Sequence, residues 1–389
     1  MDGTDKGVPV QALAAIILVC ALIAAAVMFL PGGGEEPAAV AATAADTAAG
    51  LGTEPPSRAE EILAGMTVEE KVGQMFFAGM PDGDAAGIAA EDHLGGYVLF
   101  ARNFAGKTRE EAAEMIDGVR CPGGIPLFIG VDEEGGTVNR VSLNPELRGV
   151  PFWSPQDLYE EGGFELIRSD TQEKCELLSS LGINVNFAPV CDVSQDPDDF
   201  IYDRSFGRSA GETAEYAGLV VRTMSEEGMG SALKHFPGYG GNSDTHTGLA
   251  YDRRPYETFV NSDFLPFRAG IEAGAGMVMV SHNIVECMDP DRPASLSPEV
   301  HEILRTELGF DGVIITDDLN MEAVAEFTGE EQAAVLAVLA GNDMLCCSDY
   351  RGLLSAVLGA VDRGTITEER IDESVLRILE LKLELGIIE

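Results

Sequence analysis

The feature that most constrains the fold is an alternation of short apolar runs with stretches of helical periodicity. The apolar runs are GGYVLF (95–100), IPLFIGVD (125–132), INVNFAPV (183–190), GSALKHF (230–236), GMVMVSHN (276–283), GVIITDD (312–318) and GNDMLCC (341–347). Between them, apolar residues recur every three or four positions, as in an amphipathic helix, over 108–120, 212–228, 297–309 and 330–341. Strands that alternate with helices predict a parallel sheet, because parallel neighbours need a crossover connection.

About eight such units in roughly 330 residues predict an α/β fold of the (β/α)₈ barrel type. The positions of the polar residues give a second argument. Asp132, His235, His282 and Asp317 each lie at the end of an apolar run. In a barrel the carboxyl ends of the strands meet at one face, where barrel enzymes hold their catalytic groups. An open doubly wound sheet is the alternative, although its crevice gathers fewer strand ends.

The charge of the chain excludes one class of partner. The formal net charge is −41 at neutral pH, so a nucleic acid would be repelled over the whole surface. The seven cysteines are scattered without a CxxC pair, which argues against a metal cluster and a disulfide framework. We therefore predict no nucleic acid, no metal and no cofactor; nothing in the sequence indicates the oligomeric state.

The N-terminal segment predicts a membrane anchor. Residues 12–30, ALAAIILVCALIAAAVMFL, carry no charge and are long enough to span a bilayer as one helix. A cleaved signal peptide, with secretion, is the alternative, but it usually has a shorter apolar region and a more basic start. Lys6 upstream and several acids downstream favour a cytoplasmic N-terminus and an extracytoplasmic body. We predict a single-pass anchor over 1–30 in the cell membrane.

The segment after the anchor has a different composition. Residues 31–57 are rich in alanine, glycine, proline and threonine, without apolar periodicity. Such a composition predicts a disordered linker. The catalytic barrel is then expected over 58–389.

The stretch KHFPGYGGNSDTHTG (234–248) has the composition of a catalytic loop. Lys234 and His235 end a strand, and a lysine there either forms a Schiff base with a carbonyl substrate or donates hydrogen bonds to hydroxyl groups. Asp244 lies two residues before His246, so its carboxylate can orient the imidazole and favour the protonated ring, which makes a general acid and base. A metal site is less favoured, because the histidines lie on different elements without an HxH pair. His301 is predicted to lie on a helix surface.

Two adjacent acids end the run GVIITDD. Asp318 can cap the following helix. Capping explains one acid but not both, so one of Asp317 and Asp318 is predicted to be a carboxylate nucleophile. The residues alone therefore predict a barrel hydrolase with a carboxylate nucleophile and a proton-transferring loop, and they do not identify a sugar.

Further polar candidates lie in two other loops. Asp132, in GVDEEGGTVNRV, can pair with Arg140 or accept hydrogen bonds from substrate hydroxyl groups. Its neighbours Glu133 and Glu134 are interpreted as solvated loop charges without a role. Arg204, in IYDRSFG, follows an acidic loop, where it forms a local ion pair or reaches the substrate.

Five motifs in order resemble those of the family 3 glycoside hydrolases, in the β-N-acetylhexosaminidase branch. They are GGYVLFARN, GVDEEGGTVNR, GINVNFAPVCDV, KHFPGYGGNSDTHTGL and GVIITDDLNM. The resemblance runs from about residue 59 to the C-terminus. One departure is Tyr239, which stands where members of this family typically have histidine.

The resemblance implies a single-domain barrel that removes terminal β-linked N-acetylglucosamine, with retention, from peptidoglycan fragments or chitooligosaccharides. It assigns the nucleophile to Asp317 and the acid/base pair to His246 and Asp244. The substrate-holding positions that it implies are Asp132, Arg140, Arg204, Lys234 and His235. A family 3 β-glucosidase and an N-acetylglucosaminide phosphorylase remain alternatives. A catalytically silent, membrane-tethered glycan-binding barrel is the alternative from another class.

Overall fold

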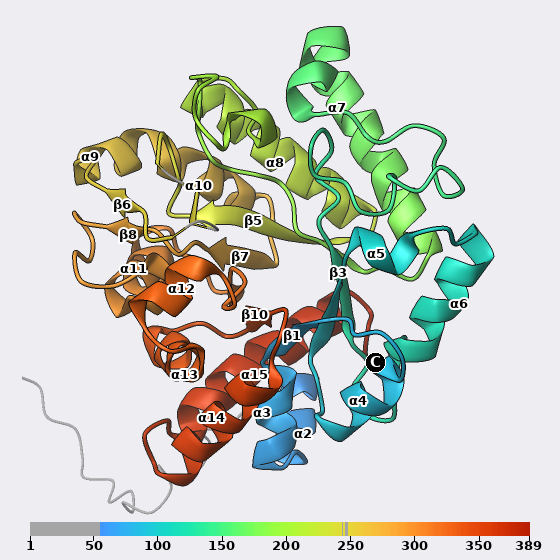
Figure 1. Ribbon diagram of the computed structural model, residues 1–389, viewed down its shortest axis with the longest axis vertical. Coiled ribbons are helices and arrows are strands. Elements are labelled where there is room, and N and C mark those ends of the chain that lie inside the picture. The colour runs from blue at the N-terminus through green and yellow to red at the C-terminus, as the bar shows by residue number, and fades with distance from the viewer. Residues whose placement is uncertain (1–54, 243, 246–247) are drawn as a thin grey trace, which may run out of the picture. The chain divides into compact units, whose positions relative to one another are not determined.

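Eight parallel strands form one sheet that closes almost completely on itself. The computed structural model describes residues 55–242, 244–245 and 248–389, and Pro56–Glu389 form one compact unit. The strand order is β10-β1-β2-β3-β4-β5-β7-β9. A parallel bridge between Ile315 in β9 and Met344, just before β10, joins the two ends of this order. The predicted barrel is therefore confirmed (Figure 1).

The strands coincide with the apolar runs of the sequence. The barrel strands are β1 Phe76–Gly79, β2 Gly96–Leu99, β3 Phe128–Val131, β4 Val185–Asn186, β5 Gly230–Phe236, β7 Met277–Val280, β9 Val313–Thr316 and β10 Leu345–Cys347. A separate pair consists of β6 Tyr251–Asp252 and β8 Ile284–Val285. Only β1, with the sequence FFAG, lies outside the predicted apolar runs.

Helices connect the strands and cover the outside of the barrel (Figure 1). They are α2 Arg58–Ala64, α3 Val68–Gln74, α4 Ala85–Glu91, α5 Ala101–Phe104, α6 Arg109–Arg120, α7 Pro155–Ser180, α8 Ala210–Glu226, α9 Tyr256–Thr258, α10 Phe264–Glu272, α11 Pro298–Glu302, α12 Glu322–Phe327, α13 Glu330–Ala340, α14 Arg351–Asp362 and α15 Glu368–Glu384. Short 3₁₀ turns lie at η1 Tyr202–Arg204 and η4 Ala294–Leu296, and π-helical turns at η3 Phe259–Asp263 and η5 Ile303–Glu307.

Polar side chains set where several helices begin. Thr108 and Ser209 accept hydrogen bonds from the backbone three residues later and so cap α6 and α8. Ser297 caps α11, with proline in its first turn. Within the part of the chain that the structure describes, no helix is both long and apolar enough to cross a membrane. The predicted anchor and nearly all of the predicted linker lie outside the described residues.

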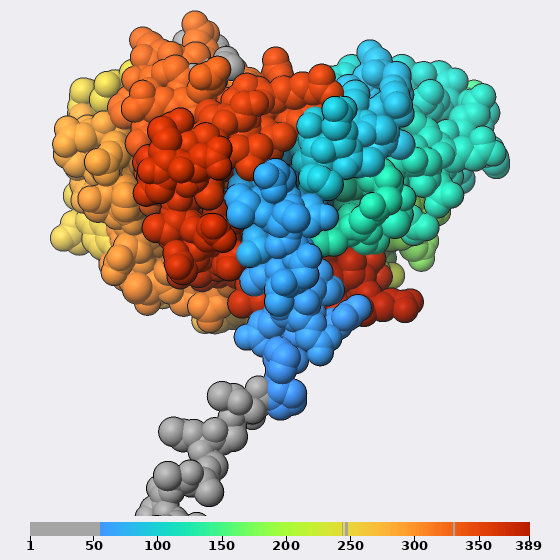
Figure 2. Space-filling model, turned by 90° about the horizontal axis from the view of Figure 1, so that it is seen from below, coloured from blue at the N-terminus to red at the C-terminus, as the bar shows by residue number. Residues whose placement is uncertain are grey.

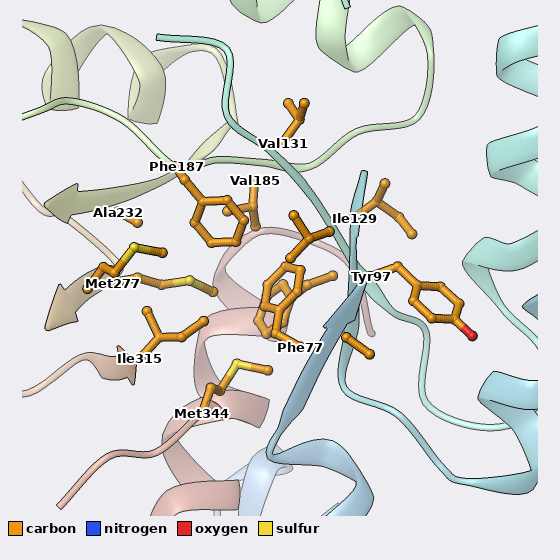
Figure 3. Packing of buried hydrophobic residues seen from close by; sticks show 14 of the residues in the cluster. Phe77, Tyr97, Ile129, Val131, Val185, Phe187, Ala232, Met277, Ile315 and Met344 are labelled. Atoms are coloured by element: carbon orange, nitrogen blue, oxygen red, sulfur yellow. The ribbon is translucent and has the colours of Figure 1, made fainter. Parts of the chain in front are cut away.

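Side chains fill the interior of the barrel, so it is a core and not a pore. The rings of Phe77 and Phe187 meet edge to face, with centroids 5.1 Å apart. Gly130 of β3 makes room for them, because a Cβ atom there would lie 2.8 Å from both rings. Figure 3 shows these rings beside Met277, Ile315 and Met344, with Tyr97 directed outward.

The strand positions that face the interior of the barrel also place polar side chains at the ends of the strands, above the core. Side chains two residues apart on a strand share a face. Asp132, Lys234 and Asp317 each lie two residues beyond an inward-facing residue of β3, β5 and β9. Packing of the core therefore directs these three side chains toward the carboxyl-terminal mouth of the barrel.

A buried carboxylate fastens the seam between β9 and β10. Asp343 is fully buried and accepts hydrogen bonds from the backbone of Ile314 at 2.9 Å and from the hydroxyl of Ser374 in α15 at 2.9 Å. It also pairs with Arg305 at 2.5 Å and Arg377 at 3.1 Å. Because a buried charge is tolerated only when it is paired, this cluster fixes β9, the strand that precedes Asp317, against α15.

The last helix closes the opposite end of the barrel. Leu381 of α15 lies against Gly276 at the start of β7 and leaves no space for a Cβ atom there. The next residue, Lys382, is buried, and its Nζ donates to Oε1 of Gln74 at 2.8 Å. Arg58 Nε donates to the backbone oxygen of Glu389 at 3.0 Å. Figure 2 shows the start of the domain, in blue, beside its end, in red.

Candidate active site

A cavity of about 310 Å³ opens at the carboxyl ends of the strands. Its charged and polar lining consists of Asp132, Glu134, Arg140, Arg204, Lys234, His235, Asp317 and Asp318. Its apolar walls are Val98, Phe100, Val138, Phe187, Met279 and Cys346. The size is that of a small-molecule site. The structure thus brings together all five predicted substrate-holding residues and the predicted nucleophile.

Lys234 is a fixed cation on the floor of this cavity. Its Nζ lies 2.6 Å from Oδ1 of Asp132 and 2.6 Å from Oε1 of Glu134. Burial lowers the pKa of the ammonium, but the two carboxylates outweigh burial and raise it. A Schiff base needs a neutral amine, so this alternative does not fit. Asp132 pairs with Lys234 rather than with Arg140.

The irregular end of β5 explains why Lys234 and His235 stand side by side. Adjacent residues of a regular strand face opposite sides. The pairing of β5 with β7 shifts register between Leu233 and Phe236. Both intervening side chains therefore line the cavity.

Glu134 is the centre of the charge network, and its interpretation as a solvated loop charge is wrong. It is buried, and Arg204 donates to both of its oxygens, at 3.0 and 2.8 Å. Burial raises the pKa of its carboxyl, but Arg204 and Lys234 hold it well below the ordinary value. Burial lowers the pKa of the Arg204 guanidinium, but the charge of Glu134 outweighs burial and raises this pKa above its ordinary value. Glu134, Arg204 and Lys234 are therefore ionised throughout the neutral range.

Glu133 has a structural role that the sequence did not reveal. Its carboxylate is buried and accepts the backbone N–H groups of Arg140 at 2.8 Å and Val141 at 2.7 Å. The turn between these groups depends on Gly135, with φ of +101°, where a Cβ atom would lie 2.1 Å from the oxygen of Trp153. Glu133 thus fixes the loop that brings Arg140 to the cavity.

His235 is oriented by a residue that was not predicted. Oδ2 of Asp192 lies 2.7 Å from Nδ1 of His235, while Nε2 lies 3.2 Å from a guanidinium nitrogen of Arg204. Because arginine only donates, the arrangement is satisfied by a ring with its proton on Nδ1. Asp192 lies two residues after the apolar run 183–190, so a search for acids close to the ends of these runs could have found it.

The two acids after β9 make different contacts. Asp317 is half-buried at the cavity, and its backbone N–H donates to the oxygen of Val280 at 2.9 Å. Asp318 accepts the N–H groups of Asn320 at 3.0 Å and Ser348 at 3.1 Å. Asp318 therefore stabilises the turn before α12 and ties it to the end of β10. The N-cap residue of α12 is Met321, so the predicted helix cap by Asp318 is wrong.

The predicted acid/base pair is only partly described. Asp244 is half-buried and is not among the described residues that line the cavity. His246 lies outside the described residues. Thr245, between them in sequence, is buried, and its Oγ1 lies 2.6 Å from the hydroxyl of Tyr239.

The remaining histidines that the sequence singled out are structural. His282 is buried behind the cavity, with Nδ1 2.7 Å from the hydroxyl of Ser295 and Nε2 3.1 Å from the backbone oxygen of Asp318. His301 is buried, so its predicted place on a helix surface is wrong; burial lowers the pKa of its ring. The described ranges contain no group of three histidine, cysteine or acidic side chains suited to a metal ion.

Fixed charges around a cavity at the carboxyl ends of a parallel barrel define the class of barrel proteins with a site for a small polar molecule. Residues 67–381 match the glycosyl hydrolase family 3 N terminal domain. The chain therefore belongs to glycosyl hydrolase family 3, as the five motifs predicted.

The relatives agree with this family. The β-hexosaminidase LpqI of Mycobacterium tuberculosis is 31% identical over 333 residues, which cover 82% of this chain and 84% of LpqI. The solved structure of M. tuberculosis LpqI superposes with a TM-score of 0.75 at 30% identity, covering 84% of this chain and 96% of that one. A family 3 β-N-acetylglucosaminidase from Paenibacillus sp. FPU-7 superposes with a TM-score of 0.78 at 36% identity and 83% of this chain. This chain spans 63% of the Paenibacillus protein.

Proposed function

We propose that the domain is a retaining exo-β-N-acetylglucosaminidase acting on peptidoglycan fragments or chitooligosaccharides. The observation that carries the proposal is the cavity in which Asp317 shares the lining with the Lys234, Asp132, Glu134 and Arg204 network. Membership of family 3 and the β-hexosaminidase relatives supply the amino-sugar class.

In the proposed mechanism, the carboxylate of Asp317 attacks the anomeric carbon and the glycosidic bond breaks. His246, oriented by Asp244, gives its proton to the leaving oxygen, and a glycosyl ester on Asp317 results. His246 then takes a proton from water, and the hydroxide displaces Asp317. Two inversions give net retention.

The charged network has a binding role in this proposal. Lys234 and Arg204 are held at fixed positions by Glu134, and both are donors for sugar hydroxyl groups. Asp132 can accept further hydrogen bonds from the substrate while it is paired with Lys234, because a carboxylate has two oxygens. Arg140 and His235 complete the lining. Groups positioned before the sugar arrives lose little freedom on binding, which favours tight orientation.

A panel of aryl β-glycosides tests the proposal. We expect the N-acetylglucosaminide to be cleaved faster than the glucoside and the xyloside, with the free β-configured sugar as first product whether or not phosphate is present. Preference for the glucoside would point to a β-glucosidase, and a sugar 1-phosphate would point to a phosphorylase. Absence of turnover on every substrate would favour a glycan-binding barrel.

We further propose that residues 12–30 anchor the chain in the cell membrane, with the barrel outside the cytoplasm and residues 31–57 as a linker. The support is the uncharged length of this segment and the bias of flanking charges. Membrane fractionation of expressing cells without detergent should find the full-length chain with the membranes. A shortened chain in the soluble fraction would mean that the segment is a cleaved signal peptide.

A further inference from the structure

The segment that joins β5 to β6 is fastened at both of its ends. At its start, a guanidinium nitrogen of Arg254 donates to the backbone oxygen of Gly238 at 3.1 Å. At its end, the backbone N–H of Leu249 donates to the carboxylate of Glu326 at 3.0 Å. The positions of both ends of this segment are therefore fixed by contacts with other parts of the domain.

Tyr239 connects the fixed floor of the site to the interior of this segment. Its backbone N–H donates to Oδ1 of Asp192 at 2.8 Å, the carboxylate that also orients His235. Its ring meets the rings of Phe200 and His235 edge to face, at 5.0 and 5.3 Å. With backbone and ring both held, its hydroxyl has a defined position.

That hydroxyl meets the hydroxyl of Thr245 at 2.6 Å. Tyr239 is 2% exposed and Thr245 is 0% exposed, so water does not compete for this hydrogen bond. Thr245 lies between Asp244 and His246 in sequence. A buried bond at this point restrains the backbone of Thr245 and of Asp244 before it.

We propose that Tyr239 and Thr245 form a latch that positions the acid/base pair for proton transfer to the leaving group. Tyr239 is a positioning residue in this role, since it acts through Thr245. The inference rests on the proposed function for its catalytic consequence, and on the geometry alone for the restraint.

The protonation state of Tyr239 is consistent with the latch. Burial raises the pKa of its hydroxyl well above the ordinary value, and the charge of Asp317 raises it further. The group therefore keeps its proton at every pH at which a glycosidase of this kind would be assayed.

Two variants remove the latch with little change of shape. Tyr239→Phe deletes one hydroxyl and Thr245→Val deletes its partner. The matched control is Tyr97→Phe, because the Tyr97 hydroxyl also makes one buried hydrogen bond, to the backbone oxygen of Ala85 at 2.8 Å, on the outer side of the barrel. The control should match the latch variants in any loss of stability and leave turnover unchanged.

Rates on two kinds of substrate distinguish positioning from general damage. For an N-acetylglucosaminide with a poor leaving group, which needs the acid, each latch variant should lower kcat about 3- to 30-fold, as loss of one buried hydrogen bond predicts. For an activated aryl leaving group the change should stay below about threefold. The double variant should be no slower than the slower single variant, because one bond is lost in all three.

Amide hydrogen exchange tests the restraint without any activity. The peptide that contains Thr245 should exchange faster in both latch variants than in the wild type and in Tyr97→Phe. If the wild type cleaves no N-acetylglucosaminide, the proposed function fails and exchange still decides on the latch. The latch would be overturned if the latch variants left amide exchange of this peptide unchanged, or if they lowered kcat equally on both substrates. It would also be overturned if the losses of the two single variants multiplied in the double variant. If Tyr239→Phe does not fold, Thr245→Val alone decides.

Discussion

Replacement of Asp317 by asparagine should lower turnover of an aryl N-acetylglucosaminide by about 10⁴- to 10⁶-fold, the range of losses found when one member of a nucleophilic catalytic unit is removed. The change keeps the shape and the backbone contact with Val280, so the fold should be retained. It removes the negative charge that attacks the anomeric carbon and stabilises the developing positive charge on the sugar ring. Steady-state kinetics with a chromogenic substrate measure the effect.

The neighbouring acid provides a matched control. Asp318→Asn removes a carboxylate one residue away, but its oxygen still accepts the backbone bonds from Asn320 and Ser348. We expect a rate within about tenfold of the wild type. In Asp317→Ala, added azide should restore product release as a glycosyl azide of inverted configuration, because one displacement replaces two. Retained full activity in Asp317→Asn would remove this residue from the mechanism.

Replacement of Lys382 by methionine should stabilise the domain at neutral pH, by about 1–3 kcal/mol. Burial lowers the pKa of Lys382 from 10.5 to about 7. Between these values the unfolded chain binds a proton that the folded chain does not, so the free energy of unfolding of the wild type rises with pH from about 7 to 10.5. Methionine fills a similar volume without a charge, and loss of the bond to Gln74 offsets part of the gain.

Urea denaturation at several pH values measures this effect. The difference between Lys382→Met and the wild type should be largest at and below pH 7 and fade as the pH rises through 10.5, above which the lysine is neutral in both states. Lys71→Met controls for the loss of one positive charge. Lys71 pairs with Asp372, which lies on α15 as Lys382 does. A parallel pH dependence in the wild type and Lys382→Met would show that the buried amine does not titrate as inferred.

The periodicity of the sequence was sufficient to predict the barrel and half of its site. Apolar runs marked seven of the eight barrel strands, and their ends marked Asp132, Lys234, His235 and Asp317, four of the eight polar residues that line the cavity. These positions are predictable because the side-chain period of two and the inward packing of the core together determine where a strand-end side chain points. Local pattern and global fold agree there.

The charge network was harder to predict from the sequence, because the conformations of loops bring its members together. Glu134 and Arg204 are 70 residues apart in the chain, and their pairing depends on the turn at Gly135. No local pattern distinguishes a buried glutamate in such a turn from a solvated one. His301 was misplaced for a related reason: it lies on an ordinary helix, but the close approach of Gly341 to its ring depends on the packing of α11 against α13.

The bond between Arg58 and Glu389 has a practical consequence for handling the domain. Both ends of the barrel chain lie on the side closed by α15, away from the mouth that holds Asp317. An affinity tag, a fluorophore or a solid support attached through either end leaves the entrance unobstructed. The two ends are also close enough for a short peptide to join them, so the chain can be reopened at another surface loop without disturbing the chemistry.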